Sequence, residues 1–165
     1  MPDSTVTICL NLNGQDREFT FPVQTSALAL LRDKAQLKSI KEGCGIGECG
    51  ACTILIDGQA VNACLVLAAQ LDQTRVFTVE GLKENKDFRS LQESFMNNHA
   101  VQCGFCTPGV LISAYSLGLH KTRVSREDIV ATVSGNICRC TGYEQIVSAI
   151  ENVLSTPSAV QGDEP

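Results

Sequence analysis

The sequence predicts an α+β fold in two parts, a small mixed sheet followed by a helical domain. Apolar and polar residues alternate on both sides of Asn13-Gly14, and again around Asp57-Gly58, which is typical of two β-hairpins. From about Leu82 onward, apolar residues recur at helical spacing, with no alternating segment between them. This change of period separates the two parts.

The first part is predicted to be a sheet with one helix across it. The hairpins span residues 5–23 and 52–66, and residues 75–79 are expected to add a closing strand. Residues 25–37 follow a helical pattern, and Ser26 is suited to cap that helix. Together these segments account for one small sheet and the helix that packs on it.

The second part is predicted to be a helical bundle. Helical spacing covers residues 88–99, 108–120, 126–134 and 143–154. We therefore expect a first domain over 1–79, a polar linker over 80–88, a helical domain over 89–154 and a disordered tail over 155–165.

Charge and composition exclude several classes of function. The chain has 165 residues, a formal net charge of −5 and 44% hydrophobic residues, so a packed core is possible. The negative charge argues against nucleic acid and anionic membranes as partners. No apolar run is long enough to cross a bilayer, and no basic leader precedes the first strand, so we expect a cytoplasmic protein.

Nine cysteines are the unusual feature of the composition. Without signs of secretion, and with an odd count, they indicate metal binding more than disulfides. Eight of them form two sets, one in each part of the chain. The ninth, Cys9, lies on the face opposite the apolar stripe of its strand, and we expect a packed or half-exposed thiol there.

The first set is Cys44, Cys49, Cys52 and Cys64, with the spacing C-x4-C-x2-C and a distant fourth cysteine. This is the spacing with which plant-type ferredoxins hold a 2Fe–2S cluster. A loop around an anionic cluster must turn sharply and direct backbone N–H groups at the sulfurs. Glycine permits both, so we assign Gly45, Gly47 and Gly50 to the cluster loop.

The second set is Cys103, Cys106, Cys138 and Cys140, and both of its pairs precede expected helix starts. Thr107 is expected as a cap before Pro108, and Thr141 with Glu144 has the spacing of a capping box. Helix N-termini favour a buried anion, so a second cluster is predicted between them. Zinc also accepts four thiolates and is the alternative at both sites, although the first spacing does not match paired zinc knuckles.

With both sets located, the sequence resembles the small iron–sulfur subunits of the molybdenum hydroxylases, the xanthine dehydrogenase and aldehyde oxidoreductase family. The similarity lies in "KEGCGIGECGACTILIDGQAVNACL", "VQCGFCTPG" and "GNICRCTGY", and covers about residues 5–153. It implies a β-grasp ferredoxin domain followed by a four-helix bundle, each with a 2Fe–2S cluster. It also implies that the first cysteine set holds the outer cluster and the second set the inner one.

The resemblance further implies partners and a role. In such enzymes a large subunit holds molybdopterin, here expected in its cytosine dinucleotide form, and an FAD-binding subunit takes the electrons. Gln102 occupies the position that contacts the pterin, and Cys140 is expected to approach it. The reaction inserts a water-derived oxygen at an electron-poor carbon and exports two electrons. Ile46 departs from the family, because many relatives carry a polar residue there.

Three hypotheses follow for the function. The first is an electron-transfer subunit of a molybdopterin-dependent hydroxylase that acts on an N-heterocycle such as a purine, or on an aldehyde. The second is a free-standing two-cluster electron carrier, which would run as a monomer. The third is a zinc-stabilised interaction module, which would be colourless. Substrate, acceptor and reduction potentials are not encoded in this chain, because specificity lies in another subunit.

Overall fold

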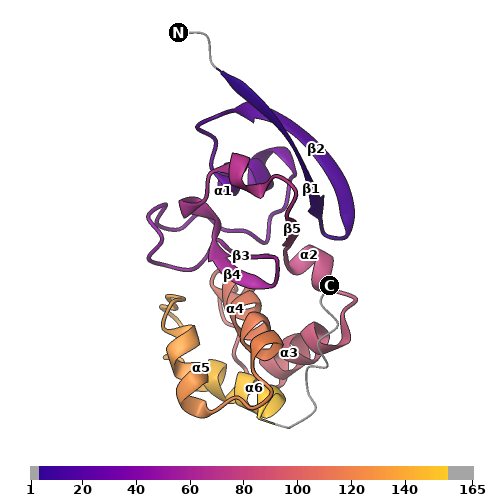
Figure 1. The fold of residues 1–165 in the computed structure, drawn as a ribbon. Coiled ribbons are helices and arrows are strands. Elements are labelled where there is room, and N and C mark those ends of the chain that lie inside the picture. Colours follow the sequence, from indigo (N-terminus) through magenta and orange to yellow (C-terminus); the bar gives the residue numbers. More distant parts are fainter. Residues whose placement is uncertain (1–3, 156–165) are drawn as a thin grey trace.

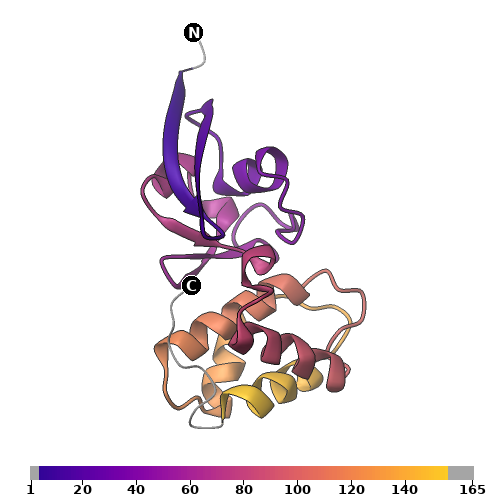
Figure 2. The ribbon, with the colours of Figure 1, turned by 90° about the vertical axis from the view of Figure 1, so that its right-hand side faces the viewer.

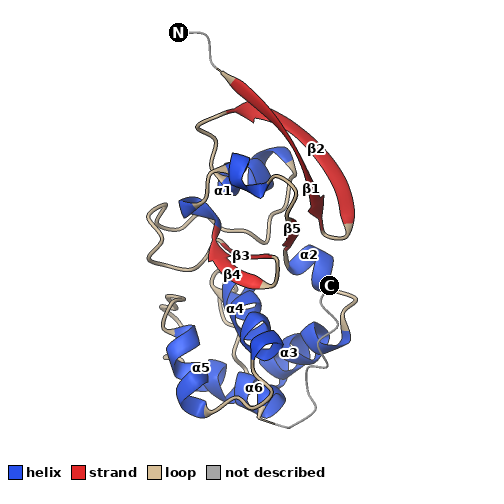
Figure 3. Ribbon diagram, in the orientation of Figure 1, coloured by secondary structure: helices blue, strands red, loops and turns tan. Residues whose placement is uncertain are grey.

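The structure, a computed structural model, describes residues 4–155. A sheet half and a helical half lie one above the other (Figures 1 and 2). The strands fall in the upper half and the longer helices in the lower half, as the colours of Figure 3 show. The predicted α+β class is confirmed.

The sheet half contains two hairpins and one closing strand. Its strands are β1 (Thr5–Leu12), β2 (Gln15–Pro22), β3 (Thr53–Ile56), β4 (Gln59–Asn62) and β5 (Arg75–Phe77), in the order β2-β1-β5-β3-β4. Only the β1–β5 pair among these is parallel. Asn13-Gly14 and Asp57-Gly58 have positive φ at all four residues, as tight hairpin turns require. Both predicted hairpins are therefore confirmed.

The helix across the sheet begins where the sequence predicts and then changes type. Helix α1 (Ala27–Ala29) is capped by Ser26, whose Oγ accepts a hydrogen bond of 3.1 Å from the Ala29 N–H. A π-helix follows over Leu30–Lys34. The segment 25–37, predicted to be helical, is thus helical over Ala27–Lys34, with a π-helix in place of regular α-helix after Ala29. Short 3-10 helices η2 (Ala63–Leu65) and η3 (Ala68–Leu71) complete this half.

The helical half contains α2 (Val79–Leu82), α3 (Lys86–Asn97), α4 (Thr107–His120), α5 (Arg126–Val133) and α6 (Glu144–Leu154). Helix α3 contacts α4 and α6, and α5 contacts the same two helices. The segment 80–88, expected as a linker, holds most of α2 and the start of α3. The expected tail lies, apart from residue 155, outside the described residues.

Helix α4 joins the two halves, because it packs against β3 and β4 as well as against its helical neighbours. Successive residues of β3 therefore face different cores. Ile54 is buried with the sheet residues, whereas Leu55 is buried with the helices. Within residues 4–155, no helix is long and apolar enough to span a membrane.

Candidate metal centres

The first cysteine set lies at the edge of the sheet half. Cys44, Cys49 and Cys52 belong to the loop that leads into β3, and Cys64 lies in η2. The thiols interact with one another: Cys49 hydrogen-bonds to Cys44, and Cys64 to Cys52. The structure thus brings together all four residues of this set, which we call the outer group.

Backbone N–H groups of the outer loop point at a sulfur. The Ile46 N–H donates to Cys44 Sγ at 3.5 Å. Hydrogen bonds from the Ile46 and Cys49 backbones, together with the Cys49 side chain, lower the pKa of the Cys44 thiol to about 7. Gly45, Gly47 and Gly50 all have positive φ (69°, 83° and 64°). This loop therefore stabilises a thiolate, which is the form that binds metal.

Cys52 has the opposite environment. Its side chain is buried, with 3% of its surface exposed. Burial raises the pKa of its thiol to about 11, and the neighbouring Cys64 side chain and the charges of Cys64 and Cys49 add to the rise. A buried thiolate needs a positive charge beside it, which a metal ion supplies. The outer group thus combines one thiol that ionises readily with one that ionises only beside a cation.

The second set, which we call the inner group, comes from two distant segments. Cys103 and Cys106 directly precede α4, and Cys138 and Cys140 lie in the turn between α5 and α6. Cys140 Sγ lies 3.5 Å from Cys103 Sγ, and the Cys106 side chain hydrogen-bonds to Cys138. All four thiols of this set are therefore brought together as well.

The electrostatic pattern of the outer group recurs here. The backbone N–H of Phe105, helped by the Cys140 side chain, lowers the pKa of Cys103. Burial raises the pKa of Cys106 to about 12, and interactions with Cys138 and Cys103 raise it further. Cys138 Sγ lies 3.1 Å from Thr141 Oγ1.

The two helix starts beside the inner group differ from the predicted caps. Cys106, not Thr107, is the N-cap of α4, and Pro108 lies in its first turn. The N-cap of α6 is Tyr143, which has a positive φ of 72°. The predicted capping box of Thr141 and Glu144 is wrong: Thr141 Oγ1 accepts from the Tyr143 N–H at 3.3 Å.

Tyr143 stabilises the inner turn with its hydroxyl group. The Cys138 N–H donates to this oxygen at 2.8 Å, and the hydroxyl donates to the Asn136 carbonyl at 3.2 Å. The segment before Cys138 is therefore held from one side by an aromatic residue of the following helix. Sequence reasoning did not assign Tyr143 a role.

The two groups of thiols are joined by a direct backbone contact. The Ile137 N–H donates to the Cys49 carbonyl at 2.9 Å. Ile137 precedes Cys138, so a member of each group lies at or next to this hydrogen bond. Sequence reasoning did not find the contact, because it depends on how the two halves pack.

Two further residues singled out in the sequence, Gln102 and Cys9, lie at the surface, and so does Arg139. Gln102 and Arg139 are exposed next to cysteines of the inner group. Cys9 is exposed in β1, where its Sγ donates to Glu18 Oε2 at 3.9 Å. Cys9 thus has a surface carboxylate as its partner, and belongs to neither group.

The thiol groups fit iron–sulfur clusters in donor chemistry and in their loops. Each offers four sulfur ligands, a backbone N–H directed at a sulfur and a partly apolar surrounding, which are the features by which proteins hold and tune such clusters. Within residues 4–155, no three His, Cys, Asp or Glu side chains are arranged as ligands of a single metal ion. The fit therefore rests on the grouping of thiols and on the loops around them.

Comparisons with known proteins agree with this fit. The family described as "2Fe-2S iron-sulfur cluster binding domain" matches residues 10–76, and the family "[2Fe-2S] binding domain" matches residues 78–151. The chain is 43% identical to the nicotinate dehydrogenase small FeS subunit of Eubacterium barkeri, over 88% of this chain and 92% of the relative. It is 39% identical, with the same coverage, to the xanthine dehydrogenase iron-sulfur-binding subunit of Escherichia coli O157:H7.

A solved structure is similar over most of its length. A chain of quinoline 2-oxidoreductase from Pseudomonas putida 86 superposes with a TM-score of 0.83 and 42% sequence identity. The match covers 88% of this chain and 90% of that chain. The similarity thus extends over both halves of the fold.

Proposed function

The chain belongs to the family of small iron–sulfur subunits of the molybdenum hydroxylases, and on this premise we propose that it relays electrons from a molybdopterin-binding catalytic subunit to a separate acceptor. The observation that carries the proposal is the convergence of eight cysteines into two adjoining thiol groups. The chain is thus one subunit of an oxidoreductase, and the substrate lies on another chain.

We propose that each thiol group holds one 2Fe–2S cluster. Cys44, Cys49, Cys52 and Cys64 would hold the outer cluster, and Cys103, Cys106, Cys138 and Cys140 the inner one. The glycine loop of Gly45, Gly47 and Gly50 supports the first assignment, because its conformation lets backbone N–H groups reach sulfur. When bound, a 2Fe–2S cluster supplies a one-electron carrier, so the two electrons released on hydroxylation of one carbon by water leave singly.

The protein's own contribution is to hold the two groups side by side and to limit the access of water. The hydrogen bond between Ile137 N–H and the Cys49 carbonyl makes a short path from one group to the other. Cys52 and Cys106, both buried, face the protein interior. Such burial helps to set the reduction potential of a bound cluster.

We assign the inner group to the catalytic partner. Gln102 and Cys140 are exposed, so both are open to a molybdopterin held by another subunit, here expected in the cytosine dinucleotide form. Arg139, also exposed, lies between two inner cysteines and is open to the same partner. An N-heterocycle or an aldehyde is the substrate class that we expect on that subunit.

We assign the outer group to the electron acceptor, which we expect to be an FAD-binding subunit. Ile46 and Leu65 flank this group, with 68% and 65% of their surfaces exposed. Leu65 packs against the loop at Gly47, the residue after Ile46, since a Cβ placed on Gly47 would come within 2.4 Å of Leu65 Cδ1. Two large exposed apolar side chains beside a thiol group favour an acceptor with an apolar contact surface.

We also propose the domain division that the sequence predicts. Residues 1–79 would form a β-grasp ferredoxin domain, and residues 89–154, which hold most of α3 and all of α4 to α6, a four-helix bundle. The pairwise packing of these helices and the separate cores of the two halves support this division.

Metal analysis of the chain purified from its native host tests the proposal. We expect about four irons per chain with acid-labile sulfide, little zinc, and molybdenum on a large subunit that co-purifies. Four irons on a lone monomer would favour a free-standing carrier. Zinc without iron would overturn the assignment of both groups.

The pterin-facing role of Gln102 has its own test. Gln102→Ala should slow reduction of the chain by the catalytic subunit, or weaken the complex, while the iron content stays unchanged. Because Gln102 is exposed, loss of iron in this variant would mean that the residue supports the cysteine loop and not the contact with the pterin.

A further inference from the structure

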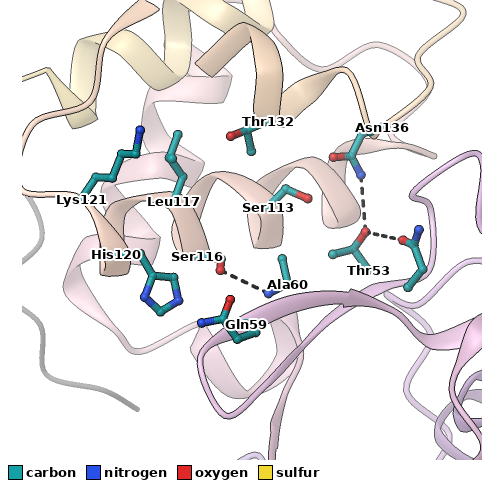
Figure 4. Close-up of a pocket in the computed structure, with 12 residues that line it drawn as sticks. Thr53, Gln59, Ala60, Ser113, Ser116, Leu117, His120, Lys121, Thr132 and Asn136 are labelled. Carbon is teal, nitrogen blue, oxygen red and sulfur yellow. Dashed lines mark hydrogen bonds between the residues drawn. The ribbon is translucent and has the colours of Figure 1, made fainter. Parts of the chain in front are cut away.

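Asn136 lies at the meeting point of the two halves, two residues before Cys138. Its side chain is almost completely buried, with 2% of the residue exposed. It points from the turn after α5 toward β3, as Figure 4 shows. A buried amide must find hydrogen-bond partners, and those of Asn136 lie in the other half of the protein.

Asn136 and Ile137 together hold two consecutive carbonyl groups of the outer loop. The Ile137 N–H donates to the Cys49 carbonyl at 2.9 Å. Asn136 Nδ2 donates to the next carbonyl, that of Gly50, also at 2.9 Å. Two hydrogen bonds between two pairs of neighbouring residues fix an orientation as well as a distance. A single bond leaves rotation about its axis free.

The contact continues through hydroxyl and amide groups into the outer loop. Thr53 Oγ1 donates to the Gly50 carbonyl at 2.7 Å and lies 3.5 Å from Asn136 Nδ2. The same oxygen lies 3.2 Å from the amide oxygen of Asn62, whose Nδ2 donates to the Gly47 carbonyl at 2.8 Å. Gly47 and Gly50, two of the loop glycines, are therefore both tied to this network.

The backbones at the contact are tightly packed, although Asn136 and Thr53 also line an adjoining pocket. A Cβ on Gly50 would lie 2.3 Å from Asn136 Nδ2, and one on Gly109 of α4 would lie 2.2 Å from the Gly50 carbonyl oxygen. The backbones of the outer loop and α4 thus approach as closely as glycine allows. A shortened side chain at position 136 would leave a buried acceptor with one donor fewer.

We propose that Asn136 is a positioning residue for electron transfer between the two cysteine groups. It locks the loop of Cys49 against the turn of Cys138, and so fixes the separation and relative orientation of the two centres. The inference rests on the proposed function, because it assumes that both groups carry clusters. It adds a residue that is buried within this chain and lies outside the two sets of cysteine ligands.

The test compares variants of the complete enzyme complex. Asn136→Ala removes the donor. Thr53→Val removes the neighbouring hydroxyl at almost constant volume, and Thr53→Ser restores it. Asn152→Ala is the matched control, because this asparagine of α6 is exposed and its side chain donates to Asn98 Oδ1 at the surface of the helical half. Thr53→Val provides the answer if Asn136→Ala does not fold.

Three quantities are measured on each variant: iron per chain, the magnetic coupling between the two reduced clusters by electron paramagnetic resonance, and amide exchange at Ile137 corrected for the intrinsic rate. With Asn136→Ala we expect full iron, a changed coupling, exchange at Ile137 about fivefold faster, and turnover with the acceptor about tenfold lower. Thr53→Val should show a smaller change in the same direction. Thr53→Ser and Asn152→Ala should match the wild type.

Coupling and exchange that stay at wild-type values in both Asn136→Ala and Thr53→Val, with full iron, would overturn the inference. So would a fall in thermal stability alone with unchanged coupling, since that is the result of a purely structural role. Failure of the proposed function is distinct, because the wild-type chain itself would then lack four irons or would purify without a large subunit that carries molybdenum.

Discussion

The outer and inner groups reach a similar arrangement of thiols by different means. The outer group comes from one short loop, with three cysteines within residues 44–52 and the fourth in η2. The inner group comes from two segments separated by α4 and α5. In both groups the pKa of one accessible thiol is lowered by a backbone N–H, and that of one buried thiol is raised by burial.

The difference teaches that one loop brings most of the outer thiols together, whereas the inner thiols meet only when two distant segments pack against each other. Three glycines with positive φ shape the outer loop, where a side chain would strain the backbone. The inner thiols meet because α4 is held inside the helical core, with Val110, Ala114 and Tyr115 fully buried. Changes to the chain should therefore act mainly on one group or on the other.

Loss of a ligand should have the largest effect and should be confined to one group. In Cys49→Ser we expect about two of four irons to be lost, with electron export abolished and reduction of molybdenum by substrate retained. Cys138→Ser should also lose about two irons, but here the first transfer from the catalytic subunit should fail. Iron analysis and rapid-mixing spectroscopy with substrate measure both effects.

Cys9→Ser is the control, because that thiol is exposed in β1 and belongs to neither group. It should keep all its iron and full turnover. Unchanged turnover with the physiological acceptor in Cys49→Ser would contradict the assigned order of the groups. Loss of all iron from either variant would show that the two sites do not form independently.

The next largest effect is expected from glycine substitutions, which should destabilise the outer loop more than the inner one. A Cβ on Gly50 would meet Asn136 and the Gly135 carbonyl at 2.3 Å, at a φ of 64°. We expect Gly50→Ala to lower the free energy of unfolding by about 3 kcal/mol, from strain and overlap together. Gly104 of the inner group has a φ of 77° but open space around its Cβ position. Gly104→Ala should lose only about 1 kcal/mol.

Denaturant unfolding of the two variants, with their iron content, measures this difference. Equal losses of unfolding free energy in the two variants would mean that backbone strain alone sets the cost. The close approach of Gly50 to the helical half would then contribute nothing. A larger loss of unfolding free energy in Gly104→Ala than in Gly50→Ala would contradict the prediction that the outer loop is the more tightly constrained of the two.

Features that depend on residues adjacent in the sequence were predictable from it. The Asn13-Gly14 and Asp57-Gly58 turns, the Ser26 cap and the change from sheet to helix near Leu82 all depend on local chemistry, and the structure has them. The membership of the two cysteine sets also follows from spacing within short motifs.

Features that depend on packing were not predictable. The change to a π-helix after Ala29 has no clear signal in a sequence of ordinary helix formers. The left-handed Tyr143 replaces the predicted capping box because its hydroxyl binds the turn before Cys138. Asn136 donates to a carbonyl 86 residues away in the chain, so no local sequence pattern indicates this hydrogen bond.

A carboxylate beside the outer loop should have a smaller effect. Glu80 of α2 accepts hydrogen bonds from the Ser39 N–H at 2.9 Å, from Ser39 Oγ at 2.6 Å and from Thr78 Oγ1 at 2.6 Å. Partial burial would raise its pKa, but these hydrogen bonds outweigh burial and hold the pKa below its ordinary 4.5. Glu80 thus ties the start of the helical half to the segment that leads into the outer loop.

Glu80→Gln should lower the free energy of unfolding by about 1 kcal/mol at pH 7, allowing for partial exposure. Because the folded pKa is depressed, this contribution is present above pH 4.5 and is lost as the pH falls through the folded value. The difference from wild type should stay nearly constant between pH 7 and about pH 5.5 in urea unfolding. Glu84→Gln, which removes an exposed ion pair with Arg89, is the control and should change little. If the difference in free energy of unfolding between Glu80→Gln and wild type already disappeared near neutral pH, the pKa of Glu80 would not be depressed.

The smallest effect on stability, and a selective effect on function, is expected at the apolar surface of the outer group. Ile46 is 68% exposed, so Ile46→Glu should change the free energy of unfolding by less than about 0.5 kcal/mol. If the acceptor meets this surface, a charge there must be desolvated on docking, so the KM for the acceptor should rise with little change in reduction by substrate.

The matched variant is Val130→Glu, because Val130 is 49% exposed on α5, away from the outer loop. Steady-state kinetics with varied acceptor separates the two surfaces. An equal change in KM in both variants would indicate a general charge effect, and no change in Ile46→Glu would remove this surface from the acceptor interface.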